Sequence, residues 1–99
     1  MSKPSVPHST PPRDALLLTP ADDVATALRP LHAGQQASVQ GLQGTLLIRQ
    51  DIPFCHKVAC RDIAAGDRVR KYGEVIGMAS TAIRAGDHVH VHNIRSVRI

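Results

Sequence analysis

The chain has 99 residues, with one Tyr, one Phe and no Trp, and it carries a formal net charge of +4. Two of the twelve basic residues, Lys3 and Arg13, lie in the proline-rich beginning, which leaves ten basic against eight acidic side chains in the remainder. Scattered charges and two isolated aromatics argue against a nucleic-acid-binding surface, which needs clustered Lys or Arg with stacking aromatics. No apolar run approaches the roughly 20 residues that span a bilayer, so we also expect no membrane partner.

The first thirteen residues, MSKPSVPHSTPPR, contain four of the seven prolines. Such a segment buries too little apolar surface to offset its ordering entropy, so we expect a disordered tail over residues 1–13. The tail lacks the apolar centre of a secretory signal, and Cys55 and Cys60 are too few for a disulfide scaffold and fit no zinc spacing. We therefore expect a cytoplasmic protein with two incidental or buried thiols. Residues 14–99 would form one domain, small enough for a partner subunit or a homo-oligomer to add stability.

Short apolar runs bounded by Gly, Pro or Asp predict β-strands along the domain. They cover residues 15–18, 24–28, 45–48, 57–60, 68–70, 74–79 and 88–92. Residues 22–28 alone could instead begin a helix with Asp22 as its cap, which Pro30 would stop within two turns. We therefore expect an all-β domain of short twisted strands, partly barrel-like, with a core of Val, Ile, Leu and Ala.

The pattern A-x-x-x-[LI]-x-A-G-[QD] occurs three times, ending at Gln35, Asp67 and Asp87. The spacings of 32 and 20 residues differ, so the pattern is a local device and not a solenoid repeat. In each copy an apolar anchor precedes Ala-Gly, and glycine accepts the positive φ that tight turns require. We expect three turns of one kind, two of which lead directly into strands.

Residues 88–93, HVHVHN, are the most distinctive segment of the chain. In a strand, alternation would place His88, His90 and His92 on one face and the two valines on the core face. Neighbouring histidines would then lie about 6.5 Å apart, so two could chelate one metal, whereas all three would span about 13 Å. We expect a site made from two of them and a ligand from elsewhere, for metal binding, acid–base chemistry or substrate binding. The alternative is an exposed face that is merely rich in histidine.

His56 is the second candidate site residue, because it lies where a loop meets a predicted strand. Lys57 beside it would attract an acidic substrate, and the alternative is an ordinary loop histidine. The remaining histidines, His8 in the tail and His32 in a turn, are expected to be structural or idle.

Four segments carry further motifs: IPF-x-HKVA (52–59), RDIA-x-GD (61–67), V-x-KYGEVIG (69–77) and I-x-AGDHVHVHN (83–93). Together they resemble the SAF domain of the altronate/galactarate dehydratase family, over residues 22–93. KYGxxIG and AGxHVHxHN are the specific elements of this resemblance. The family pattern usually has glycine where Cys55 stands, and Asp-Asn-Val where this chain has Asp22-Asp23-Val24.

The resemblance implies a β-clip fold and a part in dehydrating sugar acids such as altronate or galactarate to 2-keto-3-deoxy acids, with sulfolactate lyases as close relatives. It implies a large catalytic subunit, without which this chain would be inactive. It also implies divalent iron or manganese, bound mainly by the partner subunit or by the candidate ligands named below.

The resemblance also carries roles onto particular residues. The catalytic candidates are His56, His88, His90 and His92, and the substrate-binding candidates are Lys57 and Asn93. The candidate metal ligands are His88 and His90, joined by His92 or His56. The alternative function is a non-catalytic SAF module that binds a carbohydrate or a partner protein.

Overall fold

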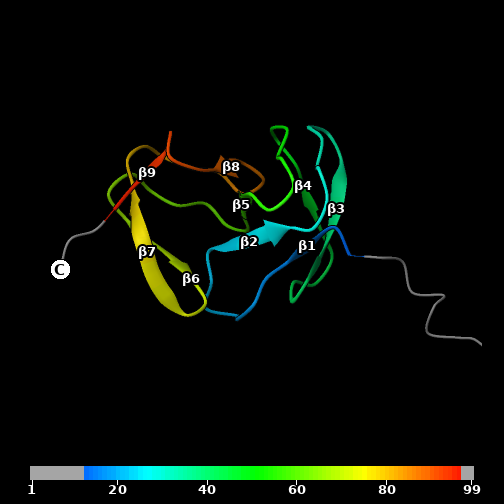
Figure 1. The fold of residues 1–99 in the computed structure, drawn as a ribbon, viewed down its shortest axis with the longest axis horizontal. Helices are drawn as coiled ribbons and strands as arrows, with labels where there is room; N and C mark the ends of the chain where they lie inside the picture. The colour runs from blue at the N-terminus through cyan, green and yellow to red at the C-terminus, as the bar shows by residue number, and fades with distance from the viewer. Residues whose placement is uncertain (1–12, 97–99) are drawn as a thin grey trace, which may run out of the picture.

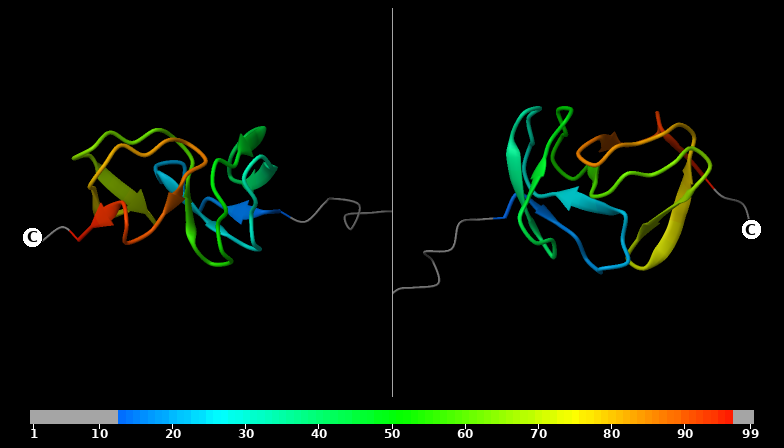
Figure 2. Two further views of the ribbon diagram at one scale, coloured as in Figure 1. Left: turned by 90° about the horizontal axis from the view of Figure 1, so that it is seen from above. Right: turned by 180° about the vertical axis from the view of Figure 1, so that it is seen from behind.

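A computed structural model describes residues 13–96, which form an all-β fold with nine short strands and no helix, as the sequence predicts (Figures 1 and 2). The strands are β1 (Ala15–Leu16), β2 (Val24–Ala27), β3 (Gln36–Gln40), β4 (Thr45–Leu47), β5 (Lys57–Ala59), β6 (Arg68–Lys71), β7 (Glu74–Ala79), β8 (His88–Val89) and β9 (Ile94–Arg95). One sheet has the order β4-β3-β1-β2-β5-β8 and the other β6-β7-β9. All pairs are antiparallel except β1 with β3.

The central strands separate two hydrophobic cores, one on the β3–β4 side and one on the β6–β7–β9 side (Figure 1). Alternation along paired strands β2 and β5 produces this division, because successive side chains point to opposite faces. Ala25 and Val58 are cross-strand partners in the first core, and Val24 and Ala59 are partners in the second. The buried hydrophobic residues of both cores are Ala, Val, Leu and Ile, as predicted.

Each core contains one pair of bridged apolar anchors followed by turns. Leu31 and Ile52 exchange backbone hydrogen bonds of 2.8 Å in the first core, and Ile63 and Ile83 do the same in the second. These anchors are fully or almost fully buried, and each bridge holds two chain segments that are distant in sequence.

Four turns of one kind follow these anchors, one more than the sequence pattern predicts. They cover residues 32–35, 53–56, 64–67 and 84–87, and in each the fourth N–H donates to the first carbonyl at 2.9–3.1 Å. The third residue has a positive φ in every turn: 92° at Gly34, 70° at Cys55, 89° at Gly66 and 93° at Gly86. A turn of this type requires such a φ at its third position, so Cys55 occupies a glycine position.

The alternative helix at residues 22–28 is wrong, because Val24–Ala27 is strand β2, paired with β1 and β5. Asp22 is fully buried and, instead of starting a helix, accepts hydrogen bonds from the turn between β6 and β7. Its carboxylate accepts hydrogen bonds from the backbone N–H groups of Tyr72 (3.0 Å) and Gly73 (2.8 Å) and from the Thr19 hydroxyl (2.9 Å). Burial by itself would raise the pKa of Asp22, but these hydrogen bonds hold it below its ordinary value.

The KYGxxIG motif is explained by the same hairpin. Tyr72 and Gly73 both have positive φ, at the turn that Asp22 holds, and the Lys71 ammonium lies 3.6 Å from the centre of the Tyr72 ring. A Cβ on Gly77 would lie 2.6 Å from the Arg95 carbonyl oxygen, so only glycine fits beside β9. These motif residues therefore maintain the fold.

Both chain ends fall largely outside the described residues. The predicted tail, residues 1–13, is described only at Arg13. After Asn93 the chain continues as strand β9, which pairs with β7 of the same chain at the edge of the second sheet. Within residues 13–96 there is no helix long and apolar enough to cross a membrane.

Candidate functional site

His56 is the fourth and last residue of turn 53–56. In two other turns the side chain of the fourth residue accepts a hydrogen bond from the first N–H of the same turn: Gln35 Oε1 accepts the His32 N–H and Asp87 Oδ2 accepts the Arg84 N–H, both at 2.9 Å. Pro53 begins the His56 turn and has no N–H to be capped. The side chain of the fourth residue is therefore released from a structural role in this turn, and here it is an imidazole.

The histidine segment is not one strand over residues 88–92. Strand β8 ends at Val89, and residues 90–93 form a turn in which the Asn93 N–H donates to the His90 carbonyl at 3.1 Å. Val89 is fully buried as predicted, but Val91 is 81% exposed and does not face the core. Strict alternation therefore fails after His90, because the chain turns to enter β9.

Three imidazoles gather where the turn before β5 meets β8. His56 Nδ1 and His88 Nε2 are 2.8 Å apart. The ring centre of His56 lies 4.4 Å from that of His90 and 5.1 Å from that of His88, with the rings stacked. One nitrogen from each of His56, His88 and His90 lies within 4.8 Å of the others, so the site consists of two histidines of the segment and one from elsewhere. We call these three residues the histidine trio.

The electrostatics of the trio favour the neutral form of His88 and His90. Burial lowers the pKa of His88, and the neighbouring charges of His92, His56 and His90 lower it further. The pKa of His90 is lowered in the same way, by desolvation and then by His56, Lys57 and His92. Since an unperturbed histidine titrates near pH 6.5, both rings are neutral at pH 7, which is the form that binds metals or accepts protons.

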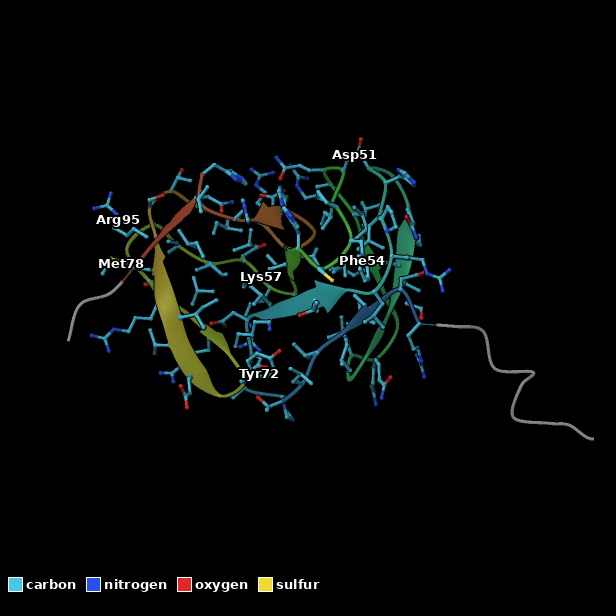
Figure 3. The ribbon with its side chains drawn as sticks, in the orientation of Figure 1. Asp51, Phe54, Lys57, Tyr72, Met78 and Arg95 are labelled. Carbon is cyan, nitrogen blue, oxygen red and sulfur yellow. The ribbon has the colours of Figure 1, made fainter. Side chains whose placement is uncertain are left out.

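The other predicted site residues take different positions. His92 is exposed, and its ring centre lies 5.2 Å from that of His88, so it adjoins the trio. Lys57 is half-buried on β5 and is close enough for its charge to lower the pKa of His90. Phe54 lies within the turn that ends at His56, and Lys57 is the first residue of β5 directly after it (Figure 3).

Asn93, the second substrate-binding candidate, holds the backbone of the histidine segment. Its side chain is buried, Oδ1 accepts the His90 N–H at 2.9 Å, and Nδ2 donates to the His88 carbonyl at 2.8 Å. Gln50 contributes a similar contact, because its Oε1 accepts the His88 N–H at 2.9 Å. Nothing in the sequence indicates Gln50, since it lies 38 residues before His88 and carries no motif.

The two cysteines take no part in the histidine trio. Cys55 is exposed and Cys60 is half-buried, and both are free thiols. Burial raises the pKa of the Cys60 thiol from 9.0 to about 11, so it remains protonated at neutral pH. His32 is exposed in its own turn and lies apart from the trio, as predicted.

The histidine trio lies on an open surface, because residues 13–96 enclose no pocket. Two large apolar side chains that are near the trio residues in sequence are exposed: Phe54, two residues before His56, and Val91, directly after His90. A small ligand bound here would be covered by the described residues on one side only.

Comparison with known proteins gives one family match over almost the whole described chain. Residues 13–97 match the altronate/galactarate dehydratase SAF domain. The chain is 48% identical over 75 residues to altronate dehydratase of Escherichia coli and 37% identical over 75 residues to that of Bacillus subtilis. It is also 45% identical over 51 residues to (2R)-sulfolactate sulfo-lyase subunit alpha of Chromohalobacter salexigens.

The extent of these matches differs between relatives. Each altronate dehydratase alignment covers 76% of this chain but only 15% of the relative, whereas the sulfo-lyase alignment covers 52% of this chain and 54% of the relative. The family model matches residues 13–97, which include every residue that the structure describes, and this match shows the family. The chain belongs to the altronate/galactarate dehydratase SAF domain family.

Proposed function

We propose that this chain is the small component of a sugar-acid lyase, and that its histidine trio binds a divalent metal in an active site shared with a larger polypeptide. The observation that carries the proposal is the convergence of His56, His88 and His90, from two separate segments, on one point of the surface. The reaction would be a dehydration of an aldonate or aldarate to a 2-keto-3-deoxy acid.

The donor set fits a transition metal. Two nitrogens at about 2.1 Å from one metal lie roughly 3–4 Å apart, so trio nitrogens within 4.8 Å of one another need only small ring rotations to share an ion. Imidazole ligands suit iron and zinc, whereas manganese prefers carboxylates. A site with three histidines thus favours iron over manganese unless the partner adds carboxylate ligands.

The proposed reaction removes a proton from C2, next to the substrate carboxylate, and expels the C3 hydroxyl with a proton as water. The resulting enol then tautomerises to the 2-keto acid. A divalent metal supplies Lewis-acid stabilisation of the negative charge that develops beside the carboxylate. Lys57 would attract the substrate carboxylate, and the exposed His92 is the chain's candidate for moving a proton, because it is free of the trio.

The larger partner is proposed from the shape of the site and from the relatives. Dehydration needs a site that excludes bulk water, and residues 13–96 enclose no pocket that would do so. The altronate dehydratases are much longer than this chain, and the sulfo-lyase relative is named as a subunit. We also place the reaction in the cytoplasm, where free thiols such as Cys55 persist.

The test is to co-express the chain with a dehydratase large polypeptide and to measure keto-acid formation from altronate, galactarate and related acids, with sulfite release from sulfolactate as a separate assay. We expect turnover that requires both polypeptides and divalent iron. His90→Ala should reduce kcat by about 10²-fold or more, whereas His32→Ala, an exposed histidine away from the trio, should not. A lack of product with every acid and a lack of complex formation would together refute the lyase function.

A further inference from the structure

The loop that carries two of the trio histidines is fixed by two amide side chains. Asn93 Oδ1 accepts the His90 N–H at 2.9 Å, and its Nδ2 donates to the His88 carbonyl at 2.8 Å. Gln50 Oε1 accepts the His88 N–H at 2.9 Å. Three backbone groups of the two histidines are thus held by side chains, next to the edge strand β8.

We propose that Asn93 and Gln50 are positioning residues that set the mutual geometry of the histidine trio for metal binding. The inference rests on the proposed metal site, and it assigns to these two amides a role that does not involve contact with metal or substrate. Asn93 is 6% exposed and both ends of its amide are bonded to the backbone of the loop, which is the contact expected of a positioning side chain.

The need for positioning follows from where the chain turns. Strand β8 is two residues long, and among residues 13–96 it pairs with β5 alone, so sheet pairing fixes the backbone of His88 but not that of His90. His90 is the first residue after the strand, and its ring must stack on His56 with centres 4.4 Å apart. The Asn93 amide spans this point by bonding to one backbone group on each side of Val89. It therefore fixes the step from His88 to His90.

Gln50 connects the trio to the first core. It lies two residues after Ile48, a fully buried residue of that core. Arg49, between them, forms an ion pair of 3.1 Å with Asp87, the residue immediately before β8. The bond from the His88 N–H to Gln50 thus ties the β8 histidines to the same half of the molecule that carries His56. Pre-set ligand geometry raises affinity because less ordering is required on binding.

The experiment measures binding of Co²⁺ to the isolated chain by calorimetry and by the visible absorption of the bound ion. Side chains that orient metal ligands typically contribute 10- to 100-fold in affinity, so we expect Asn93→Ala and Gln50→Ala each to weaken binding by about that factor and to alter the absorption spectrum. Gln50→Glu retains the oxygen that accepts the His88 N–H and should bind nearly as tightly as the wild type. Gln43→Ala, an exposed glutamine away from the trio, is the matched control.

The outcomes separate the possible failures. Co²⁺ affinity that is the same in Asn93→Ala, Gln50→Ala and Gln43→Ala would overturn the positioning role. If Asn93→Ala fails to fold, the surface pair Gln50→Ala and Gln50→Glu decides the question, since equal affinity in these two also overturns it. A wild-type chain that binds no Co²⁺ refutes both the metal site and this inference. Variant-dependent Co²⁺ binding with no lyase activity supports the inference and refutes the proposed reaction.

Discussion

The two halves of the molecule use the same construction for different ends. The first half has the bridge between Leu31 and Ile52 with turns 32–35 and 53–56, and the second has the bridge between Ile63 and Ile83 with turns 64–67 and 84–87. In three of these turns the third residue is glycine and the fourth is Gln or Asp. In turn 53–56 these positions are Cys55 and His56.

This difference shows how one turn can present a side chain such as His56 to the rest of the molecule without an added strand or helix. Gln35 and Asp87 cap the first N–H of their own turns. The turn that starts with Pro53 has no such N–H, so His56 is free to approach His88, which follows the equivalent turn of the other half by one residue. The site lies where the two halves meet, and neither half contains it alone.

The largest expected effect tests whether the two bridges are equivalent supports. Leu31→Ala and Ile83→Ala each remove a fully buried anchor, and each should lower the free energy of unfolding by about 2–5 kcal/mol. Chemical denaturation of both variants measures this. A loss under 1 kcal/mol in one variant only would show that the halves do not contribute alike.

The glycine positions of the turns give the next contrast. Gly34 and Gly86 have nearly the same φ, 92° and 93°, but a Cβ on Gly34 would meet nothing within 4 Å, whereas one on Gly86 would lie against the Leu47 carbonyl oxygen. Gly34→Ala should cost about 1–2 kcal/mol for its backbone conformation, and Gly86→Ala should cost clearly more. Thermal melting of the two variants compares them, and equal Tm values would contradict the close approach of Gly86 to β4.

Asp22 connects the halves, because it lies between β1 and β2 and holds the turn of the β6–β7 hairpin. Asp22→Asn should lower stability at pH 7 by about 1–3 kcal/mol, since a buried acceptor of several N–H bonds is replaced by a group that also donates. The folded pKa lies below the ordinary value of 3.8, so the carboxylate stabilises the fold above that pH and loses its effect as the pH falls through the folded pKa. Denaturation at pH 7 and at pH 3 should therefore show a smaller difference between wild type and variant at the lower pH.

The smallest expected effect concerns turn 53–56, in which Cys55 takes the position of glycine. Cys55 has a φ of 70°, which costs an L-residue about 1–2 kcal/mol. A glycine at this position would remove this cost, but it would lose more conformational entropy on folding, which would lower the stability by about 0.5–1 kcal/mol. Cys55→Gly should thus stabilise the chain by up to about 1 kcal/mol without changing Co²⁺ affinity, as denaturation and calorimetry can check. A destabilised variant would show that the thiol makes a favourable contact.

Much of the fold was predictable because its signals are local. The Ala-Gly turns and the short apolar runs predict an all-β domain, and the presence of only one Tyr and one Phe predicts an aliphatic core. The fourth turn was missed because Cys55 hides the glycine pattern, although Ile52 stands in the anchor position. Strand β3 was missed because Gln36–Gln40 has only Ala37 and Val39 as its buried residues, and pairing with β1 and β4 decides its structure.

The sequence by itself determined that His88 and His90 lie close together, and it predicted that a site built on two such histidines would take a third group from elsewhere, with His56 as a candidate. Short-range geometry suffices for this, because two residues of one segment cannot move far apart. Only the tertiary structure decided that His56, 32 residues from His88, completes the trio, that His92 stays outside it, and that Asn93 is turned inward. The first two facts depend on how the two halves of the molecule pack against each other. The third depends on the His88 carbonyl and the His90 N–H, which need hydrogen-bond partners that the buried Asn93 amide supplies.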